Sequence, residues 1–439
     1  MSLPKYSEYR DSCIDWLGHI PAHWSVVPVR HLTTCLDGKR VPLNSEQRAD
    51  RPGDVPYWGA NCVMDYIDAS LFDEELILLG EDGAPFFDRA KPVAFFSQGP
   101  VWPNNHVHVL RPLRTCIGRY LVHALNATNF GMFIDGSTRD KLTQGEMNRI
   151  PIALPTIDEQ TAIATFLDHE TAKIDALITE QEKLIALLAE KRQATISHAV
   201  TRGLNPDAPM KDSGVAWLGE VPGHWDVKRI KRIVSSIEQG WSPQCENFPT
   251  SAPDEWGVLK VGCVNGGIFR PDENKKLPVE LDPIPNYSLK RGDLLISRAN
   301  TRDLVGSAAV VDEDFANLML CDKLYRLRLD ESQCIPEFLA AYLGTPRSRS
   351  QIELNATGAS SSMLNIGQSV ILELVAPIPT VEEQQKIIQF LSVELQRLQS
   401  LITQADAAIT LLKERRAALI AAAVTGQIDV RGAMAAATI

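Results

Sequence analysis

Arginine and asparagine side chains are concentrated in the stretch SRANTR at 297–302, which follows the apolar run GDLLI. These two side-chain types can make bidentate contacts to the edges of guanine and adenine in the major groove of DNA. The apolar run predicts a strand, so we expect Arg298, Asn300 and Arg302 to lie in the loop after it. For any one of these residues the alternative is an ordinary solvated loop position.

Comparable polar stretches occur in both halves of the chain. The stretch KRIKR at 228–232 is the densest basic cluster, and RSRS at 347–350 and TGASSS at 357–362 add groups suited to phosphate contacts. Closer to the N-terminus, WPNNHVH at 102–108 and DGSTRDK at 135–141 have a similar character. From residue type and predicted loop placement, the candidate DNA contacts are Asn104, His106, Arg139, Lys228, Arg229, Arg270, Arg298, Asn300, Arg302 and Arg347.

Motifs of known catalytic sites are missing from the sequence. We find no GxxxxGK[ST] phosphate loop, no HExxH, no GxSxG and no [DNS]PP[YF] tetrapeptide of amino-group methyltransferases. Two alternate histidines at 104–109 could be metal ligands, but hydrogen-bonded or base-contacting histidines are the favoured interpretation. The eight cysteines lack CxxC spacing, so they predict neither a zinc site nor a disulfide framework. We therefore predict no catalytic residue, no metal and no cofactor bound by this chain.

The bulk composition is that of a globular protein with two to four domains. The chain has 439 residues, 44% of them hydrophobic and 23% charged, and a net charge of −11. Because the overall charge is acidic, any contact with DNA must use local patches. The N-terminus lacks the apolar core of a signal peptide, and no run approaches the roughly 18 apolar residues of a membrane span. These features predict a soluble, cytoplasmic protein.

The chain contains one long segment twice, at 156–203 and at 380–427. With a constant offset of 224 and no gap, 20 of the 48 positions are identical, which indicates two copies of one structural unit. A shorter repeat precedes each copy, as WLGHIPAHW at 16–24 and WLGEVPGHW at 217–225. Between the short and the long repeat, 132 positions separate Trp24 from Thr156, and 155 separate Trp225 from Thr380. The short and long repeats therefore form a duplicated scaffold, and the segments between them differ in the two copies.

Each long repeat is predicted to be one α-helix. No proline occurs between Thr156 and Asn205 or after Pro379, and acidic residues follow Thr156 and Thr380 as at helix starts. Apolar residues recur with the three-to-four spacing of a coiled coil, so we expect the two helices to pack on each other. The alternative is that each helix covers only its own domain. The predicted coiled-coil and subunit-docking residues are Ile174, Leu177, Leu184, Leu188, Leu398, Leu401, Ile409 and Leu412.

The segments upstream of the long repeats have the pattern of mixed α+β domains. In the first, strands are expected at 92–96 and 106–110 and a helix at 118–130. In the second, strands are expected at 257–264 and 292–298 and a helix at 336–345. The predicted organisation is a first domain at 1–155, a helix at 156–203, a linker and second domain at 204–379, a second helix at 380–430 and a flexible tail at 431–439.

This arrangement resembles the specificity subunit of Type I restriction-modification enzymes. The resemblance is carried by the two WLG…P.HW entries, by the helix starts LPTIDEQ and IPTVEEQ, and by GSTRDKL at 136–142. RGDLLISRAN at 291–300 and VTGQIDVR at 424–431 also match. It covers essentially the whole chain and both repeats.

The resemblance implies an α+β fold of two mixed α/β target recognition domains, each followed by a long conserved helix. The helices would pair as an antiparallel coiled coil with pseudo-twofold symmetry and set the spacer between the half-sites of a bipartite, asymmetric DNA target. Implied partners are double-stranded DNA, two copies of a methyltransferase subunit and translocase-nuclease subunits. S-adenosylmethionine, ATP and magnesium would be used by those partners.

Two other functions are compatible with parts of the pattern. One is a structural adaptor that carries two binding modules on a coiled-coil stalk and has no role in DNA recognition. The other is an inactive relative of a methyltransferase, which the missing donor-site motifs disfavour.

Overall fold

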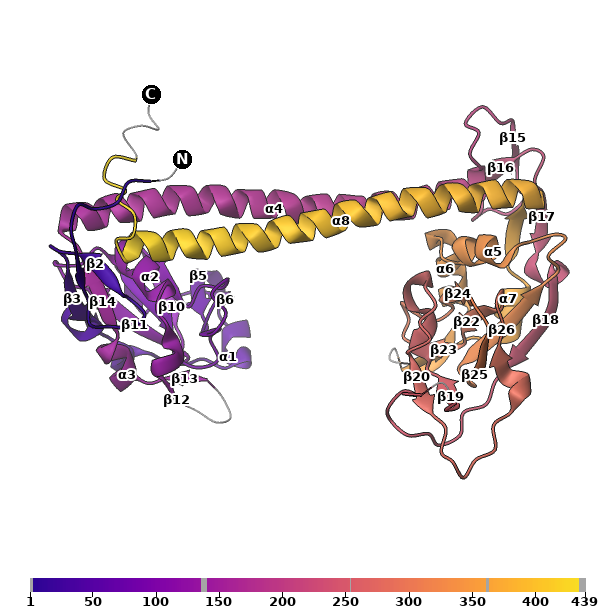
Figure 1. Cartoon of the computed structure of the whole chain (residues 1–439), viewed down its shortest axis with the longest axis horizontal. Coiled ribbons are helices and arrows are strands. Elements are labelled where there is room, and N and C mark those ends of the chain that lie inside the picture. The colour runs from indigo at the N-terminus through magenta and orange to yellow at the C-terminus, as the bar shows by residue number, and fades with distance from the viewer. Residues whose placement is uncertain (1–2, 136–139, 253, 361–362, 434–439) are drawn as a thin grey trace. The chain divides into compact units, whose positions relative to one another are not determined.

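The computed structural model describes residues 3–135, 140–252, 254–360 and 363–433 (Figure 1). The chain forms two compact units. The first combines residues 1–183 with 404–439, and the second comprises residues 184–403. Each unit therefore contains one mixed domain and a part of each long helix.

The first unit is built on two four-stranded sheets. One has the strand order β4-β11-β8-β9 and is antiparallel, and the other has the order β6-β5-β10-β7 with β5 and β10 parallel. Helix α2 packs on β8 and β9. The elements are β1 (Tyr9–Asp11), β2 (His19–Pro21), β3 (Ser25–Pro28), β4 (Thr33–Cys35), α1 (Ser45–Ala49), β5 (Pro52–Trp58), β6 (Val63–Ile67), β7 (Phe72–Asp73), β8 (Leu76–Gly80), β9 (Ala94–Ser97), β10 (Pro100–Pro103), β11 (Val107–Pro112), α2 (Gly118–Asn126), β12 (Ile134–Asp135), β13 (Lys141–Leu142), α3 (Gln144–Arg149) and β14 (Pro151–Leu154), with short 3₁₀ turns η1 (Val29–His31), η2 (Asp37–Lys39) and η3 (Phe130–Met132).

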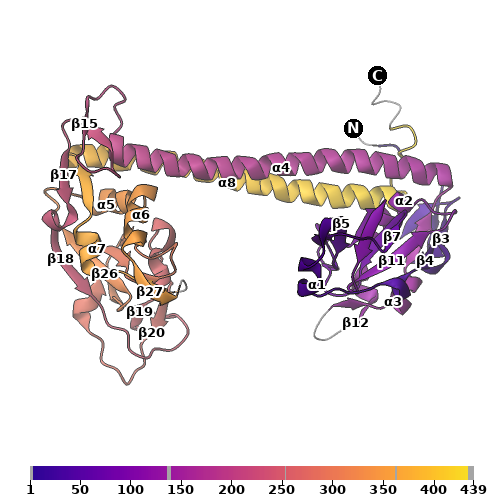
Figure 2. The same ribbon diagram turned by 180° about the vertical axis from the view of Figure 1, so that it is seen from behind.

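The second unit repeats this plan. Its sheets have the orders β18-β26-β22-β24 and β20-β19-β25-β21, again with one parallel pair, β19 and β25, and a third sheet has the order β23-β28-β27. Figure 2 shows this unit from behind, with β18, β26, β19 and β20 labelled. The elements are β15 (Met210–Asp212), β16 (Glu220–Pro222), β17 (Asp226–Arg229), η4 (Ile230–Arg232), β18 (Val234–Gln239), β19 (Gly257–Leu259), η5 (Val261–Gly267), β20 (Asn274–Lys276), η6 (Pro285–Tyr287), β21 (Ser288–Leu289), β22 (Leu294–Ser297), β23 (Ala299–Asn300), β24 (Ala308–Val310), β25 (Phe315–Met319), β26 (Leu324–Leu329), α5 (Pro336–Leu343), α6 (Pro346–Leu354), β27 (Thr357–Ser360), β28 (Met363–Asn365), α7 (Gln368–Leu372) and β29 (Val375–Ile378).

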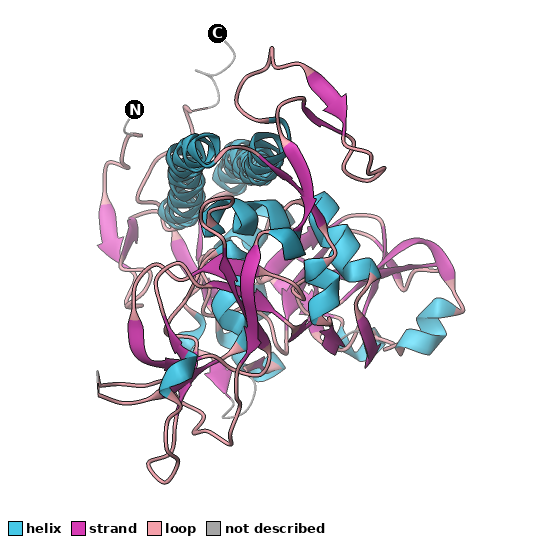
Figure 3. Ribbon diagram, turned by 90° about the vertical axis from the view of Figure 1, so that its right-hand side faces the viewer, coloured by secondary structure: helices cyan, strands magenta, loops and turns pink. Residues whose placement is uncertain are grey.

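The two long repeats are single helices, α4 (Ile157–Arg202) and α8 (Val381–Val424), and they lie side by side (Figure 3). In the first unit Arg416 Nε lies 2.9 Å from Asp175 Oδ1, and in the second Lys191 Nζ lies 4.0 Å from Glu394 Oε1. Residue numbers rise along one helix as they fall along the other, so the pair is antiparallel. The predicted fold class is confirmed.

Five of the eight predicted coiled-coil and subunit-docking residues are removed from solvent, as a helix seam requires. Ile174, Leu188, Leu398 and Ile409 are buried, and Leu412 is half-buried. These residues follow the three-to-four spacing that a coiled coil requires.

The other three predicted seam residues, Leu177, Leu184 and Leu401, are 51%, 42% and 40% exposed, so placing them in the seam was wrong. Successive helix residues are rotated by about 100°. The seam therefore continues from Ile174 through positions 178, 181 and 185, and the leucines at 177 and 184 lie beside it.

The start of each long helix is fixed by one buried glutamine. Gln160 Oε1 accepts from the backbone N–H of Ile117 at 2.8 Å, and its Nε2 donates to the carbonyl of Pro155 at 3.0 Å. Gln384 makes the corresponding bonds to Ile335 at 2.9 Å and to Pro379 at 2.9 Å. The EQ dipeptide that both repeats share therefore joins each helix to its own domain.

Gln384→Ala is expected to destabilise the second unit by about 2 kcal/mol, because the partly buried N–H of Ile335 loses its acceptor. Urea unfolding, followed by tryptophan fluorescence, measures the change. Gln385→Ala, at the exposed neighbouring position, is the control and should leave the unfolding midpoint unchanged. Equal effects of the two substitutions would contradict this role of Gln384.

The predicted strand at 257–264 was too long. Strand β19 ends at Leu259, and the chain continues as the irregular η5, in which Gly266 and Gly267 have φ values of 75°. The predicted strand at 106–110 and the helices at 118–130 and 336–345 correspond to β11, α2 and α5. All eight cysteines are free, and none of the described helices is long and apolar enough to cross a membrane.

Candidate nucleic-acid interface

Each unit gathers four connections at one edge of its sheets. In the first unit these are the β5–β6 turn, the loop after β8, the β10–β11 loop and the β12–β13 pair, which we call the first loop edge. In the second unit the corresponding parts are η5, the loop after β22, the β25–β26 loop and the β27–β28 pair, the second loop edge. Loops at one edge of a rigid sheet are a common place for binding residues.

Glu81 and Arg298 occupy equivalent positions on the two edges. The N–H of Glu81 donates to the carbonyl of His106 at 3.0 Å, and the N–H of Arg298 donates to that of Lys323 at 2.8 Å. Their own carbonyls accept from Leu142 at 2.8 Å and from Ile366 at 2.9 Å. The same backbone frame therefore carries a carboxylate in one domain and a guanidinium in the other.

The second loop edge brings several of the predicted residues together. Asn300 Nδ2 donates to Asn265 Oδ1 at 3.2 Å, and Arg270 Nη1 donates to the carbonyl of Asn265 at 2.6 Å. Arg298 is half-buried and makes one long bond, 3.4 Å, to the Asp322 carbonyl. Arg302 is exposed, and no described residue is bonded to its side chain. The edge thus presents three guanidinium groups and two amides.

Three of the predicted contacts lie elsewhere in the second unit. Lys228 and Arg229 are on β17, where Lys228 Nζ lies 2.9 Å from Asp226 and Arg229 Nη1 lies 2.9 Å from Glu373. Arg347 is the second residue of α6 and donates to the Leu218 carbonyl at 2.6 Å. Acidic or carbonyl partners occupy all three, so the structure gives them roles within the domain and does not bring them to the second loop edge.

The predicted residues of the first loop edge have different surroundings. Asn104 is buried, and its Oδ1 accepts from the N–H of His106 at 2.7 Å, so it stabilises the turn. The His106 side chain is 40% exposed, with Nδ1 3.4 Å from Asp82 Oδ2. Arg139 lies outside the described residues.

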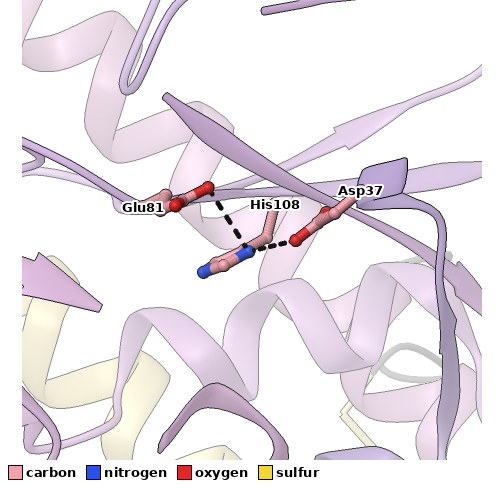
Figure 4. A group of neighbouring side chains, drawn as sticks. All are labelled: Asp37, Glu81 and His108. Carbon is pink, nitrogen blue, oxygen red and sulfur yellow. Dashed lines mark hydrogen bonds and ion pairs between the residues drawn. The ribbon is translucent and has the colours of Figure 1, made fainter. Parts of the chain in front are cut away.

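Asp37, Glu81 and His108 form a cluster of side chains at the first loop edge, where Glu81 follows β8 (Figure 4). The buried His108 places Nδ1 2.6 Å from Asp37 Oδ2 and 3.7 Å from Glu81 Oε2, and its Nε2 is 2.9 Å from the carbonyl of Leu142. Both ring nitrogens therefore have a hydrogen-bond partner, the Asp37 carboxylate on one side and a backbone carbonyl on the other. Because both ring nitrogens are engaged in hydrogen bonds, His108 has none left for a metal, and hydrogen bonding is the favoured role of these three residues.

Two cations complete this cluster. Arg40 Nη1 lies 2.6 Å from Glu81 Oε2, and Lys141 Nζ lies 3.4 Å from Glu81 Oε1. Burial opposes ionisation of Asp37, but the hydrogen bond and charge of His108, with Arg40 adding to them, hold the pKa of Asp37 below its ordinary value. The cluster is therefore a network of hydrogen bonds and ion pairs that fixes β8, β11 and β13 to one another.

Asp37→Asn is expected to destabilise the first unit by about 3 kcal/mol at neutral pH, because the buried His108 loses the carboxylate 2.6 Å from its Nδ1. The pKa of Asp37 is lower in the folded than in the unfolded chain. The stability that ionised Asp37 contributes is therefore fully present above its unfolded pKa of about 3.8. It is lost as the pH falls through the lower, folded pKa. Urea unfolding as a function of pH should show the difference from wild type shrinking below about pH 4. Asp50→Asn, at an exposed position, is the control; a pH-independent difference would contradict this account.

Sequence reasoning missed Asn265, Lys323 and the Glu81 cluster. A signal for Glu81 was present, since GEDG follows its apolar run as SRAN follows the run before Arg298. Lys323 is exposed opposite Arg298 and could be recognised only from the strand pairing.

Residues 21–186 and 222–411 each match the family model of the Type I restriction modification DNA specificity domain. The two matches cover most of the chain. The chain belongs to this family. Two copies of the specificity domain make it a specificity subunit with two recognition domains, and an adaptor unrelated to DNA is not favoured.

Curated relatives carry the corresponding names. The chain is 28% identical over 206 residues to the EcoEI specificity subunit of Escherichia coli, an alignment that covers 47% of this chain and only 34% of that relative. It is 24% identical over 419 residues to the EcoKI specificity subunit of Escherichia coli K12, covering 89% of this chain and 84% of the relative. It is 22% identical over 434 residues to the StySPI specificity subunit of Salmonella potsdam, covering 94% of this chain and 90% of the relative.

Two solved structures share the fold over nearly the whole chain. The HsdS subunit from Thermoanaerobacter tengcongensis has a TM-score of 0.50 at 16% identity, covering 93% of this chain and 98% of that one. A chain from a study of complex assembly and conformational transition of the type I R-M system has a TM-score of 0.59 at 17% identity, covering 92% and 98%. At these identities the comparisons show the fold alone.

Proposed function

We propose that this specificity subunit reads a bipartite, asymmetric DNA sequence, one half with each loop edge. The observation that carries this proposal is the repeated backbone frame with different side chains at equivalent positions, Glu81 in one domain and Arg298 in the other. A duplicated scaffold with equal side chains would read a symmetric target. Opposite charges at the same place favour two different half-sites.

The second loop edge has the groups that major-groove reading requires. Arg298, Arg302 and Arg270 can each donate two hydrogen bonds to guanine, and an asparagine amide can bond adenine. Lys323 adds an exposed cation suited to a phosphate. This half-site is therefore expected to contain guanine and adenine.

The first loop edge offers a different set. His106 is exposed beside Asp82, while Glu81 is held by Arg40 and Lys141 and fixes the loop that carries these groups. His106 and Arg139 stay our predicted contacts there, and Asn104 supports the turn on which His106 lies.

The acidic charge and the exposed apolar residues of the helices support assembly with DNA-modifying subunits. A net charge of −11 leaves much of the phosphate neutralisation to partners. Leu177 and Leu411 in the first unit, and Leu184, Leu187 and Leu401 in the second, are 40–65% exposed. We expect these leucines to bind two copies of a methyltransferase subunit. Translocase-nuclease subunits would then join this complex. S-adenosylmethionine, ATP and magnesium would be bound by those partners, and this chain would be non-catalytic.

Replacing Leu184 and Leu187 by lysine is expected to weaken binding of the methyltransferase subunit about tenfold or more. Docking would remove these half-exposed side chains from water, which contributes about 1 kcal/mol each, and the lysines would bury charge. Titration of the purified chain with the methyltransferase subunit by calorimetry measures the change. Lysine at the exposed polar positions Glu182 and Glu190 is the control for altered charge, and unchanged affinity of the leucine variant would exclude this docking surface.

Selection from random duplexes tests the proposed function. The chain assembled with its methyltransferase subunit should enrich sequences with two defined parts separated by a stretch of free sequence. Enrichment of one continuous or palindromic sequence would contradict two different reading edges. No enrichment over the methyltransferase subunit alone would favour the adaptor.

A further inference from the structure

A tight turn on the second loop edge carries a residue that the sequence pattern did not single out. Within η5, Asn265 has φ −64° and ψ 135°, and Gly266 has φ 75° and ψ 12°. These values are those of the two central residues of a type II turn, which requires glycine at the second of them. The turn holds the Asn265 side chain at the start of the loop.

Asn300 orients the Asn265 amide but leaves part of its hydrogen-bonding capacity unused. Asn300 Nδ2 donates to Asn265 Oδ1 at 3.2 Å, while Asn300 Oδ1 accepts from the N–H of Thr301 at 2.9 Å. Asn265 Oδ1 keeps one lone pair, and no described residue accepts from its Nδ2. Of the two amides, Asn265 therefore has the larger unused hydrogen-bonding capacity.

Arg270 is tied to the same turn. Its N–H donates to the Cys263 carbonyl at 2.8 Å, and its Nη1 donates to the Asn265 carbonyl at 2.6 Å. The remaining guanidinium donors of this exposed side chain are directed away from that bond. The bond to the Asn265 carbonyl thus fixes the Arg270 guanidinium next to the Asn265 amide.

We propose that Asn265 is the adenine-reading residue of the second recognition domain and that Asn300 is its positioning residue. An amide with a free Nδ2 and an oxygen lone pair can donate to adenine N7 and accept from adenine N6 at the same time. Arg270, held by the Asn265 carbonyl, contacts the neighbouring base or phosphate. This inference rests on the proposed function, because it names the base read by one of the two edges.

The test uses the full chain assembled with its methyltransferase subunit and compares duplexes that differ at single positions of the second half-site. Asn265→Ala should reduce discrimination at one A·T pair by about 5- to 150-fold and leave the other positions unchanged. Asn265→Asp, which keeps the acceptor but loses the donor, should shift the preference there toward cytosine. Asn300→Ala should affect the same position more weakly, and Arg229→Ala on β17 should have no effect.

The outcomes separate this inference from the proposed function. If the second half-site contains no A·T pair, or if the Asn265 variants weaken all sequences equally, Asn265 does not read adenine. If those variants leave discrimination unchanged while a variant lacking both Arg298 and Asn300 relaxes the half-site, only this inference fails. If the wild-type complex shows no second half-site, the proposed function itself fails. Thermal unfolding of each variant identifies a loss of folding, which Asn265→Asp should not cause.

Discussion

Replacing both Arg298 and Asn300 by alanine will abolish selection for one half of the DNA target and leave the other half selected as before. Arg298 follows β22 on the second loop edge, and Asn300 holds the amide of Asn265 there at 3.2 Å. Each bidentate base contact contributes about 1–3 kcal/mol to discrimination, so losing that of Arg298 corresponds to roughly 5- to 150-fold. Removing Asn300 adds to this loss, because the Asn265 amide is no longer oriented. Competition binding, with duplexes altered in one half-site at a time, measures both halves.

A matched control removes two cations from the same unit at a distance from the loop edge. Arg229 and Lys231 both pair with Glu373, at 2.9 and 2.6 Å, so replacing both by alanine changes the charge of the domain without changing the loop edge. This variant should retain both half-sites. Equal loss of selectivity in the two variants would show that charge, and not base reading, is responsible.

The second large effect concerns the tryptophan of each short repeat. Trp225 is fully buried in the core of the second unit, packs edge-on against Phe338 and lies against Gly203 at the end of α4. Trp24 has the same place in the first unit, against Gly426 at the end of α8. Trp225→Ala should therefore destabilise the second unit by about 3–5 kcal/mol.

Hydrogen exchange measures this effect in each unit separately. Trp225→Ala should lower protection in β22 and β26 first, and Trp24→Ala should lower it in β8 and β11 first. Each variant is the control for the other. Loss of protection that is equal in both units for both variants would contradict two separate cores joined by shared helices.

Much of the fold could be predicted because the repeat makes it visible. The gapless repeat without proline defines both helices, and the shared glutamines Gln160 and Gln384 mark their starts. The seam register was only partly predictable. Leu177 and Leu184 have the same spacing as the true seam, and only packing shows which row of apolar residues faces the partner helix.

The candidate site was predictable where polar residues follow a strand directly, as at Arg298. Lys228 and Arg229 were assigned to the interface from charge density alone, and their partner Glu373 is too distant in the sequence to be recognised. Asn265 was missed because its glycine-rich surroundings suggest only a strand and a turn. Its bond to Asn300 spans 35 positions of the chain and arises from folding.

Long-read methylation sequencing tests the central claim most directly. A host without methylation of its own would carry this chain with its methyltransferase subunit, in parallel with the variant that lacks Arg298 and Asn300. We predict a two-part methylated motif for the wild type and, for the variant, loss of the second part's sequence requirement or of methylation altogether. A continuous motif, or the same motif and extent of methylation in both strains, would contradict the account.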